Sequence, residues 1–574
     1  MWPLFLAVTY SIALCLNGGS THPVILAVQQ GEHVIPLDTL RPDNRGCLRF
    51  EGGCVLEPGQ YMFIQENKRL FNFLISAGEP LNIAFTASIR NGRTEEIRVE
   101  GSEENNTYIR FYRFLQEKYA RANDILEQNT DPEKALVEVE RLEATIREYT
   151  SFLASQFEGQ MLGIIAKNVF TPLVPPEAST LHYLDNIDFT DPRILNTSIL
   201  PLRLSEYFTR ILPPVPDTVI LHADRILKGD IHPMVKRYAA QYFFRLFFGS
   251  EVMGMETAAV HMARNWLLAD TSLCDDIAVR LEMETFVRFN SQCLTGMPAP
   301  ALDLPDACGN IRPLHASPTR YTVVVFFEDN CPACSEALLQ LVNMSERHQE
   351  QDLTFYAVYT QDRKEILSRY ADFFPQNWIT VWDPDFTSGF HEKYNVRSTP
   401  RIYLLDRNKT IIGRDLDPGT LEQLLKDDQQ KNKTTMTRAP DMVLETENGE
   451  SYALSDVTSP FTVLYFYDPA CAVCGMITAA LYDLFKTADE QKIKVFAVYT
   501  GNDYKSWRKW LAEGGYTDWI NAWNPSGDDR IHRHFNVNDP PLILLLDAEK
   551  HIIADHLSVT ALSYILNELI SDSL

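Results

Sequence analysis

The chain has 574 residues, enough for about three to five domains of ordinary size. It carries 52 Lys and Arg residues against 77 Asp and Glu residues, which gives a formal net charge of −25. An acidic surface of this size repels polyanions, so the charge argues against a nucleic-acid-binding protein. With 45% hydrophobic and 22% charged residues, the composition is that of a globular protein without chain-wide disorder.

The N-terminal segment is apolar. Residues 2–16 contain no charge, and small polar residues follow them. This pattern is typical of a secretory signal peptide, so we expect residues 1–20 to be a signal peptide and the protein to be exported to the periplasm or cell envelope. No Lys or Arg precedes the apolar core, and a first buried strand is the alternative. The residues before Cys15 partly resemble a lipobox, but Leu14 is bulky, so a lipoprotein anchored in the membrane through Cys15 is the less favoured variant.

In the next part of the chain, the spacing of the apolar residues changes once. Short strand-like runs such as residues 24–28 and 61–64 are separated by Gly and Pro up to residue 103. From Glu104 onward the apolar residues follow helical spacing. We therefore expect a β-sandwich-like domain over residues 21–103 and an α-helical domain over residues 104–295. The helical domain shows no pattern that indicates chemistry.

The second half of the chain contains an internal repeat. Residues 321–327 match residues 461–467 in their apolar pattern, and later matches keep this register to within one residue. Matches that hold over a whole unit indicate two copies of one domain. We expect tandem α/β domains over residues 296–425 and 439–574. The polar segment between them, residues 426–438, is expected to be a linker.

Each copy carries a Cys-x-x-Cys motif directly after an apolar strand and before a helical pattern. The motifs are Cys331 with Cys334 and Cys471 with Cys474. A pair at this spacing is also half of a zinc site or a small structural disulfide. No second ligand pair lies near either motif in the sequence, so we expect no metal. A disulfide across two residues constrains the unfolded chain little, so stability is a poor reason for the spacing.

The position of the motifs favours redox chemistry. A cysteine at a helix N-terminus faces unpaired backbone N–H groups and the positive end of the helix dipole, and both lower the thiol pKa. We therefore expect Cys331 and Cys471 to be the attacking nucleophiles. Cys334 and Cys474, one turn later, are expected to resolve the mixed disulfides.

The two repeats resemble thioredoxin-fold domains of the TlpA/ResA type, which are exported thiol–disulfide oxidoreductases. The β-then-helical N-terminal half resembles the front part of Bacteroidota envelope proteins of this group, in segments such as residues 56–61 and 101–105. The matching features are an Ala-Pro pair at each domain start, the strand before the motif, and Ser-Thr-Pro followed by a strand at residues 398–406. The resemblance implies a cis peptide bond before Pro400 and Pro541. It also makes Thr399 and Pro540 the residues that bind an extended substrate beside the cysteines.

The resemblance implies protein thiols or disulfides as substrates and a redox partner protein in the envelope, with no cofactor. The direction of electron flow stays open. One alternative is an envelope scaffold or ligand-binding protein that kept the fold and has little turnover. Another is a thiol peroxidase, although neither motif supplies the Pro-x-x-x-Thr/Ser-x-x-Cys pattern of peroxiredoxins.

The two repeats differ from each other and from thioredoxin. Thioredoxin keeps a buried Asp on the strand before the motif, whereas Val325 and Tyr465 stand at the matching positions. Thr399 has a backbone N–H to offer a substrate, and Pro540 has none. We therefore expect the first site to meet the protein substrate and the second to exchange with a redox partner or with the first site. The remaining cysteines suggest pairs between Cys47 and Cys54 and between Cys274 and Cys293, with Cys308 left over.

Overall fold

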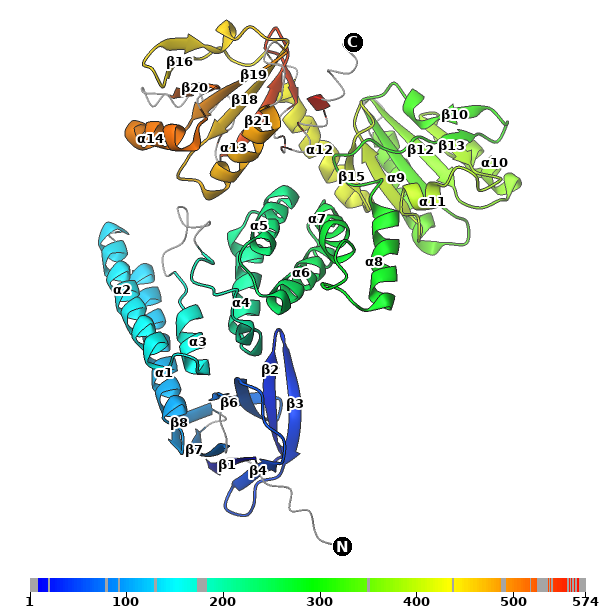
Figure 1. Ribbon diagram of the computed structural model, residues 1–574. Helices are drawn as coiled ribbons and strands as arrows, with labels where there is room; N and C mark the ends of the chain where they lie inside the picture. Colours follow the sequence, from blue (N-terminus) through cyan, green and yellow to red (C-terminus); the bar gives the residue numbers. More distant parts are fainter. Residues whose placement is uncertain are drawn as a thin grey trace. The chain divides into compact units, whose positions relative to one another are not determined.

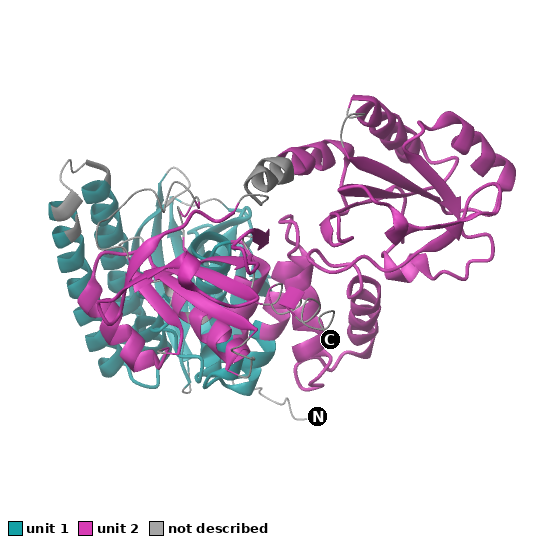
Figure 2. Cartoon of the chain, turned by 90° about the horizontal axis from the view of Figure 1, so that it is seen from above, with its two compact units in different colours: residues 1–213, 225–239 teal, residues 214–224, 240–574 magenta. Residues whose placement is uncertain are grey.

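A computed structural model describes most of the chain, and Figure 1 shows its elements. The described residues are 9–18, 21–77, 81–90, 93–128, 132–172, 183–347, 352–435, 438–486, 492–516, 518–523 and 540–554, with the single positions 535, 537, 557, 559, 562, 565 and 566. The chain divides into two compact units, residues 1–213 with 225–239 and residues 214–224 with 240–574 (Figure 2).

The N-terminal part is a pair of four-stranded sheets that share one core. Phe50 and Phe85 of one sheet contact Phe63 and Phe73 of the other, with ring centroids 6.0 Å apart for Phe50 and Phe63 and 4.9 Å apart for Phe73 and Phe85. The expected β-sandwich is therefore confirmed. One sheet has the order β4-β1-β7-β8, with β1 (Tyr10–Asn17), β4 (Cys47–Gly52), β7 (Leu81–Arg90) and β8 (Arg93–Glu100). The other has the order β3-β2-β5-β6, with β2 (Val24–Gln30), β3 (His33–Leu40), β5 (Gly59–Gln65) and β6 (Lys68–Ile75).

Strand β1 occupies residues 10–17 of the segment predicted to be a signal peptide, and it fits the alternative of a first buried strand. It pairs with both β4 and β7, and Ile12 and Leu14 are fully buried. Cys15 forms a disulfide with Cys47, and the expected Cys47–Cys54 pair is therefore wrong. An uncharged apolar run is typical both of the apolar part of a signal peptide and of a buried strand. Here alternate residues of the run face the hydrophobic core of the two sheets. Residues 1–8 and 19–20 lie outside the described residues.

The middle of the chain is helical, as predicted. Helix α1 begins just after Ser102, whose Oγ accepts a hydrogen bond from the Asn105 N–H at 3.1 Å and caps the first turn. None of the described helices is both long and apolar enough to cross a bilayer. The elements are α1 (Glu103–Gln128), α2 (Pro132–Gln156), α3 (Met161–Asn168), η2 (Pro192–Asn196), α4 (Ile199–Glu206), η3 (Tyr207–Ile211), α5 (Pro216–Lys228), α6 (Pro233–Phe248), α7 (Glu256–Met262), η4 (Ala263–Leu267) and α8 (Ile277–Asn290).

A five-stranded sheet with the order β13-β12-β11-β14-β15 follows, beside a short β9–β10 hairpin. Its central strand β11 is parallel to β12 and antiparallel to β14, and all seven of its residues are buried. A strand that is buried along its whole length needs cover on both faces of the sheet. The elements are β9 (Asp303–Pro305), β10 (Ile311–Pro313), η5 (Leu314–Ala316), β11 (Tyr321–Phe327), α9 (Pro332–Arg347), β12 (Leu353–Tyr359), α10 (Lys364–Phe373), β13 (Trp378–Trp382), α11 (Phe390–Lys393), β14 (Arg401–Leu405), β15 (Ile411–Arg414) and α12 (Pro418–Thr435).

The last sheet has the same five-strand core, in the order β20-β19-β18-β21-β22. Here the leading hairpin joins the sheet, because β16 pairs with β20. Strand β18 has the same parallel and antiparallel neighbours as β11. The elements are β16 (Val443–Thr446), β17 (Ser451–Ala453), η6 (Leu454–Asp456), β18 (Phe461–Tyr467), α13 (Ala472–Phe485), β19 (Ile493–Tyr499), α14 (Tyr504–Gly514), β20 (Ile520–Trp523), β21 (Leu542–Leu546) and β22 (Ile552–Ala554).

Helix α12 covers most of the segment that the sequence predicted to be a linker. It runs through Thr435, so most of residues 426–438 is helical, while residues 436–437 lie outside the described part. Its first turns bury Leu421 and Leu425, and a helix that is already nucleated extends at little cost through Lys, Gln and Asp. The polar segment has no apolar face, which is why its sequence suggested a linker.

Candidate active site

The first Cys-x-x-Cys motif lies where strand β11 passes into helix α9. Asn330 takes a left-handed conformation with φ of 60°, which Asn tolerates better than most residues, and Pro332 opens the helix. This turn places Cys331 directly before the first helical turn. The Cys334 N–H donates to Cys331 Sγ at 3.0 Å, so the sulfur caps the helix N-terminus.

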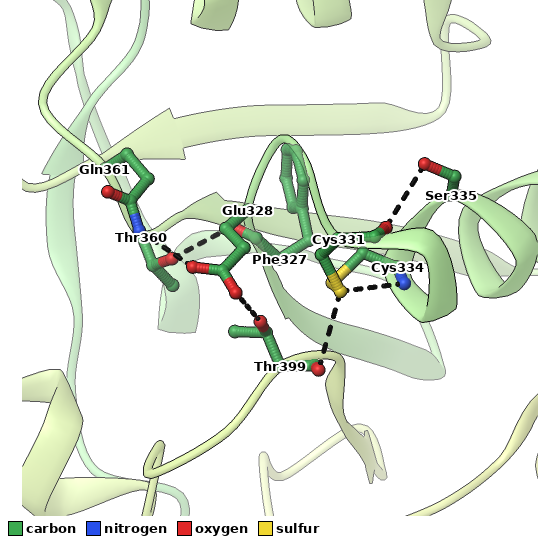
Figure 3. The surroundings of a disulfide bond; sticks show 8 residues. All are labelled: Phe327, Glu328, Cys331, Cys334, Ser335, Thr360, Gln361 and Thr399. Carbon is green, nitrogen blue, oxygen red and sulfur yellow. Dashed lines mark hydrogen bonds between the residues drawn. A yellow bond between two sulfur atoms is a disulfide. The ribbon is translucent and has the colours of Figure 1, made fainter.

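The two sulfurs of the first motif differ in their surroundings. They form a disulfide, with Cys331 half-buried and Cys334 fully buried. The Cys331 Sγ also lies 3.7 Å from the backbone carbonyl oxygen of Thr399, and the Thr399–Pro400 peptide bond is cis (Figure 3). The structure thus brings together the four residues that the sequence predicted for this site.

A carboxylate that the sequence analysis missed joins this site. Glu328 follows β11 directly, and its Oε1 accepts a hydrogen bond from the Thr399 hydroxyl at 2.8 Å. Its Oε2 accepts another from the Gln361 side-chain amide at 2.8 Å (Figure 3). By contrast, Glu336 on α9 is exposed and accepts a hydrogen bond from the Gln340 side-chain amide one turn further along. A charged residue directly after a fully apolar strand was the available sequence signal for Glu328.

The second motif has the same backbone geometry, with its two cysteines as thiols and not as a disulfide. The Cys474 N–H donates to Cys471 Sγ at 3.4 Å, and Cys471 caps helix α13. The Cys471 Sγ lies 3.4 Å from the carbonyl oxygen of Pro540, and the Pro540–Pro541 bond is cis. Cys471 is half-buried and Cys474 is fully buried. The four residues predicted for this site therefore also lie together.

Burial decides which thiol of the second motif holds its proton. It raises the pKa of Cys474 well above the ordinary value, and the hydrogen bond with Cys471 and the charge of Cys471 raise it further. The thiolate is the nucleophilic form of cysteine. Cys474 is therefore the poorer nucleophile of the pair at neutral pH.

The strand position that carries a buried Asp in thioredoxin holds no carboxylate in either domain. Val325 and Tyr465 are both fully buried there. The Tyr465 hydroxyl donates to the Cys474 carbonyl at 3.2 Å and shares a hydrogen bond with Thr478 Oγ1 at 2.9 Å. Burial, and then the charge of Cys474, raise the pKa of Tyr465 well above its ordinary value. Tyr465 therefore stays protonated beside the second cysteine pair.

Comparisons with known proteins match the two halves of this region separately. Residues 294–427 match the redoxin family, and residues 436–554 match the AhpC/TSA family. No curated protein matches the chain.

Parts of the chain are similar to several solved structures. A domain of a possible thiol-disulfide isomerase from Cytophaga hutchinsonii is 25% identical, covers 25% of this chain and 99% of its own, and has a TM-score of 0.24. A thioredoxin-like protein from Bacteroides caccae is 19% identical, covers 44% of this chain and 94% of its own, and has a TM-score of 0.35. The thioredoxin domain of a thiol-disulfide oxidoreductase from Bacteroides vulgatus is 21% identical, covers 24% and 96%, and has a TM-score of 0.22.

The two family matches fall on the two sheets that carry the cysteine pairs. In each, a Cys-x-x-Cys motif follows the central strand and faces the carbonyl oxygen before a cis-proline. The predicted resemblance to thioredoxin-like proteins is confirmed. The C-terminal half of this chain contains two thioredoxin-like domains, one that matches the redoxin family model and one that matches the AhpC/TSA family model.

Proposed function

We propose that the protein is a cell-envelope thiol–disulfide oxidoreductase with two Cys-x-x-Cys sites. One observation carries this proposal. In both domains a half-buried cysteine caps a helix N-terminus, a fully buried cysteine lies one turn later, and a carbonyl oxygen next to a cis-proline lies within 3.7 Å of the first sulfur. A structural disulfide needs neither an accessible first sulfur nor a neighbouring backbone edge to which a substrate could bind.

The reaction is a pair of thiol–disulfide exchanges. The Cys331 or Cys471 thiolate attacks a substrate disulfide, forms a mixed disulfide, and releases one substrate sulfur, which takes up a proton. The Cys334 or Cys474 thiol then loses its proton and attacks the first cysteine, which releases the second substrate sulfur. Two electrons pass from the enzyme to the substrate, and the cysteine pair becomes a disulfide. The reverse sequence oxidises a substrate dithiol.

The roles of the cysteines follow from exposure and charge. The first cysteine of each pair receives an N–H donor and the helix dipole, and both stabilise a thiolate. The second is closed off from solvent and acts after the substrate is attached. We therefore propose Cys331 and Cys471 as nucleophiles and Cys334 and Cys474 as resolving thiols.

The residues before the cis-prolines are proposed to bind the substrate backbone. An extended peptide that adds to an exposed backbone edge uses main-chain hydrogen bonds for affinity. Thr399 and Pro400 form this edge in the first domain, and Pro540 and Pro541 form it in the second. Protein thiols or disulfides are the proposed substrates, and a redox partner protein of the envelope is proposed to reset the cysteine pairs.

Export is the proposed setting for this chemistry. Disulfides persist in oxidising compartments such as the periplasm, and Cys15 and Cys47 form a disulfide far from either Cys-x-x-Cys motif in the sequence. This disulfide supports the proposal that the folded protein, residues 10–17 included, lies in the envelope.

An insulin-reduction assay with dithiothreitol as the electron donor tests the function. We expect turnover by the parent and by Cys331→Ser or Cys471→Ser alone, and none by the variant with both changes. The Cys334→Ser and Cys474→Ser variants should hold client proteins as mixed disulfides. A parent without turnover and without trapped clients would mean a scaffold in place of an enzyme.

A thiol peroxidase is the second candidate, because residues 436–554 match the AhpC/TSA family. Peroxide consumption measured beside insulin reduction separates the two. Peroxide consumption that depends on Cys471 and exceeds insulin reduction would favour the peroxidase.

A further inference from the structure

Glu328 connects three segments of the first domain that are distant in sequence. It stands at the end of β11, and its two carboxylate oxygens accept hydrogen bonds from Thr399 before β14 and from Gln361 after β12, each at 2.8 Å (Figure 3). Hydrogen bonds that a carboxylate accepts are charge-assisted. One side chain therefore holds the cis-proline loop against the end of the central strand.

Thr399, whose hydroxyl is bound by Glu328, is also the residue that faces the Cys331 sulfur. The Thr399 carbonyl oxygen lies 3.7 Å from Cys331 Sγ. Among the described residues, nothing accepts a hydrogen bond from the Thr399 N–H. These two backbone groups are the ones with which an extended peptide would pair. Fixing the Thr399 side chain fixes the orientation of this edge before a substrate arrives, which lowers the entropy lost on binding.

The two hydrogen bonds of Glu328 with Thr399 and Gln361, here called the tether, have no counterpart among the described residues of the second domain. Its matching residues are Asp468, Gly501 and Pro540. The Asp468 carboxylate turns to its own loop and accepts a hydrogen bond from the Ala470 N–H at 2.9 Å. Gly501 has no side chain, and Pro540 has neither a hydroxyl nor an N–H. The tether and the N–H are absent together, although the cysteine geometry is the same in both domains.

We propose that Glu328 is a positioning residue of the first site: it holds Thr399 in the conformation that pairs with an extended protein substrate. This inference rests on the proposed oxidoreductase function. It assigns docking of extended polypeptides to the first site, since the second has the cysteine chemistry without the tether. Glu328 acts through Thr399, so it governs substrates that use the backbone edge and leaves small disulfides unaffected.

The test uses the full chain with the second site removed by Cys471→Ser and Cys474→Ser. Two activities are measured: reduction of insulin with dithiothreitol as donor, and the reaction of the reduced site with 5,5′-dithiobis(2-nitrobenzoate), which is too small to use the edge. For Glu328→Gln we expect the KM for insulin to rise about threefold to tenfold, from the loss of the charge-assisted bonds. The rate with the small disulfide should stay within about twofold of the parent, and Thr399→Val should behave like Glu328→Gln.

Two controls separate docking from other effects. Glu336→Gln removes a nearby exposed carboxylate that lies outside the tether, and we expect it to change neither activity. Thr399→Ser keeps the hydroxyl, so its KM for insulin should stay close to that of the parent. In the double variant Glu328→Gln with Thr399→Val, the loss should not exceed that of the larger single loss, because both changes break the same contact.

The outcomes are distinct. If Glu328→Gln slows insulin and the small disulfide equally, Glu328 acts on the cysteines or on folding, and the positioning role is wrong. If it changes neither, the tether has no role in docking. If the parent reacts with neither insulin nor the small disulfide, the proposed function itself fails and this inference fails with it.

Discussion

Within each Cys-x-x-Cys pair, three residues of separation produce opposite environments. Cys331 and Cys471 stand before the helix and keep part of their surface exposed, while Cys334 and Cys474 point into the domain core and have none. The same short motif therefore yields one sulfur that a substrate reaches and one that it does not. This division follows from helix geometry, since the second cysteine lies on the first helical turn.

Thiol labelling of the reduced protein tests this division in the second domain. Because burial raises the pKa of Cys474, its thiolate is scarce at pH 8, and iodoacetamide should modify Cys471 and leave Cys474 unmodified. Raising the pH to 10 should leave this order unchanged. Peptide mapping by mass spectrometry reads the result in a Cys331→Ser, Cys334→Ser background. Equal labelling of Cys474 at pH 8 would contradict the assignment of the resolving thiol.

Pro540 provides a second test at the residue scale. Replacing it by Thr gives the second docking edge the N–H that it lacks, at a position whose carbonyl oxygen already faces Cys471 Sγ at 3.4 Å. One backbone hydrogen bond contributes about 0.5–1.5 kcal/mol, so insulin reduction at the second site should improve between about twofold and tenfold.

The measurement is kcat/KM in the Cys331→Ser, Cys334→Ser background. Pro540→Ala is the matched control for the N–H alone and should give a similar gain. No gain with either residue would show that the missing donor does not limit the second site.

The residues of the two sites were predictable to different degrees. The cysteines were predicted from the order of strand, motif and helix, which is local information, and the cis-prolines from the resemblance to thioredoxin-fold domains. The contact between Glu328 and Thr399 joins residues 71 positions apart. Nothing near either residue marks the other as its partner, so this contact appears with the folded domain.

At the scale of elements, helix α8 and the first thioredoxin-like domain share a buried polar network. Asn290, at the end of α8, accepts hydrogen bonds from Arg414 Nη2 of β15 at 2.7 Å and from Asn395 Nδ2 at 3.1 Å. Arg414 also donates to the Cys293 carbonyl at 3.2 Å and is 3% exposed. A boundary at residue 296 separates Asn290 and Cys293 from the partners that they bind, so we propose that the first domain includes the end of α8.

Asn290→Ala tests this junction. It leaves the buried Arg414 guanidinium short of an acceptor, which costs about 1–3 kcal/mol. We expect faster hydrogen exchange in β14 and β15, measured by mass spectrometry on the full chain. Asn290→Asp keeps an acceptor and should lose less protection. Exchange in these strands that is unchanged in Asn290→Ala would mean that the junction adds nothing to the stability of the domain.

At the scale of the whole molecule, the disulfide between Cys15 and Cys47 tests both compartment and N-terminal structure. Its cysteines are 32 residues apart, and a disulfide that closes a loop of this length contributes about 3–4 kcal/mol. In protein isolated from the envelope, non-reducing peptide mapping should find Cys15 linked to Cys47. The Cys15→Ser variant should lower the unfolding temperature of the N-terminal sheets, whereas Cys54→Ser, at a free exposed cysteine, should not. A mature protein that begins after residue 17 would contradict the role of β1.

The sequence by itself determined the two thioredoxin-like domains, their cysteine pairs, and the change from strands to helices near residue 103. These features are periodic or local, so neighbouring residues carry the information. Only the tertiary structure showed that residues 10–17 form a strand, that Cys15 pairs with Cys47, that α12 extends to Thr435 and that Glu328 accepts a hydrogen bond from Thr399. An apolar or polar run suits more than one structure, and the segments that pack against it from elsewhere in the chain select one of them.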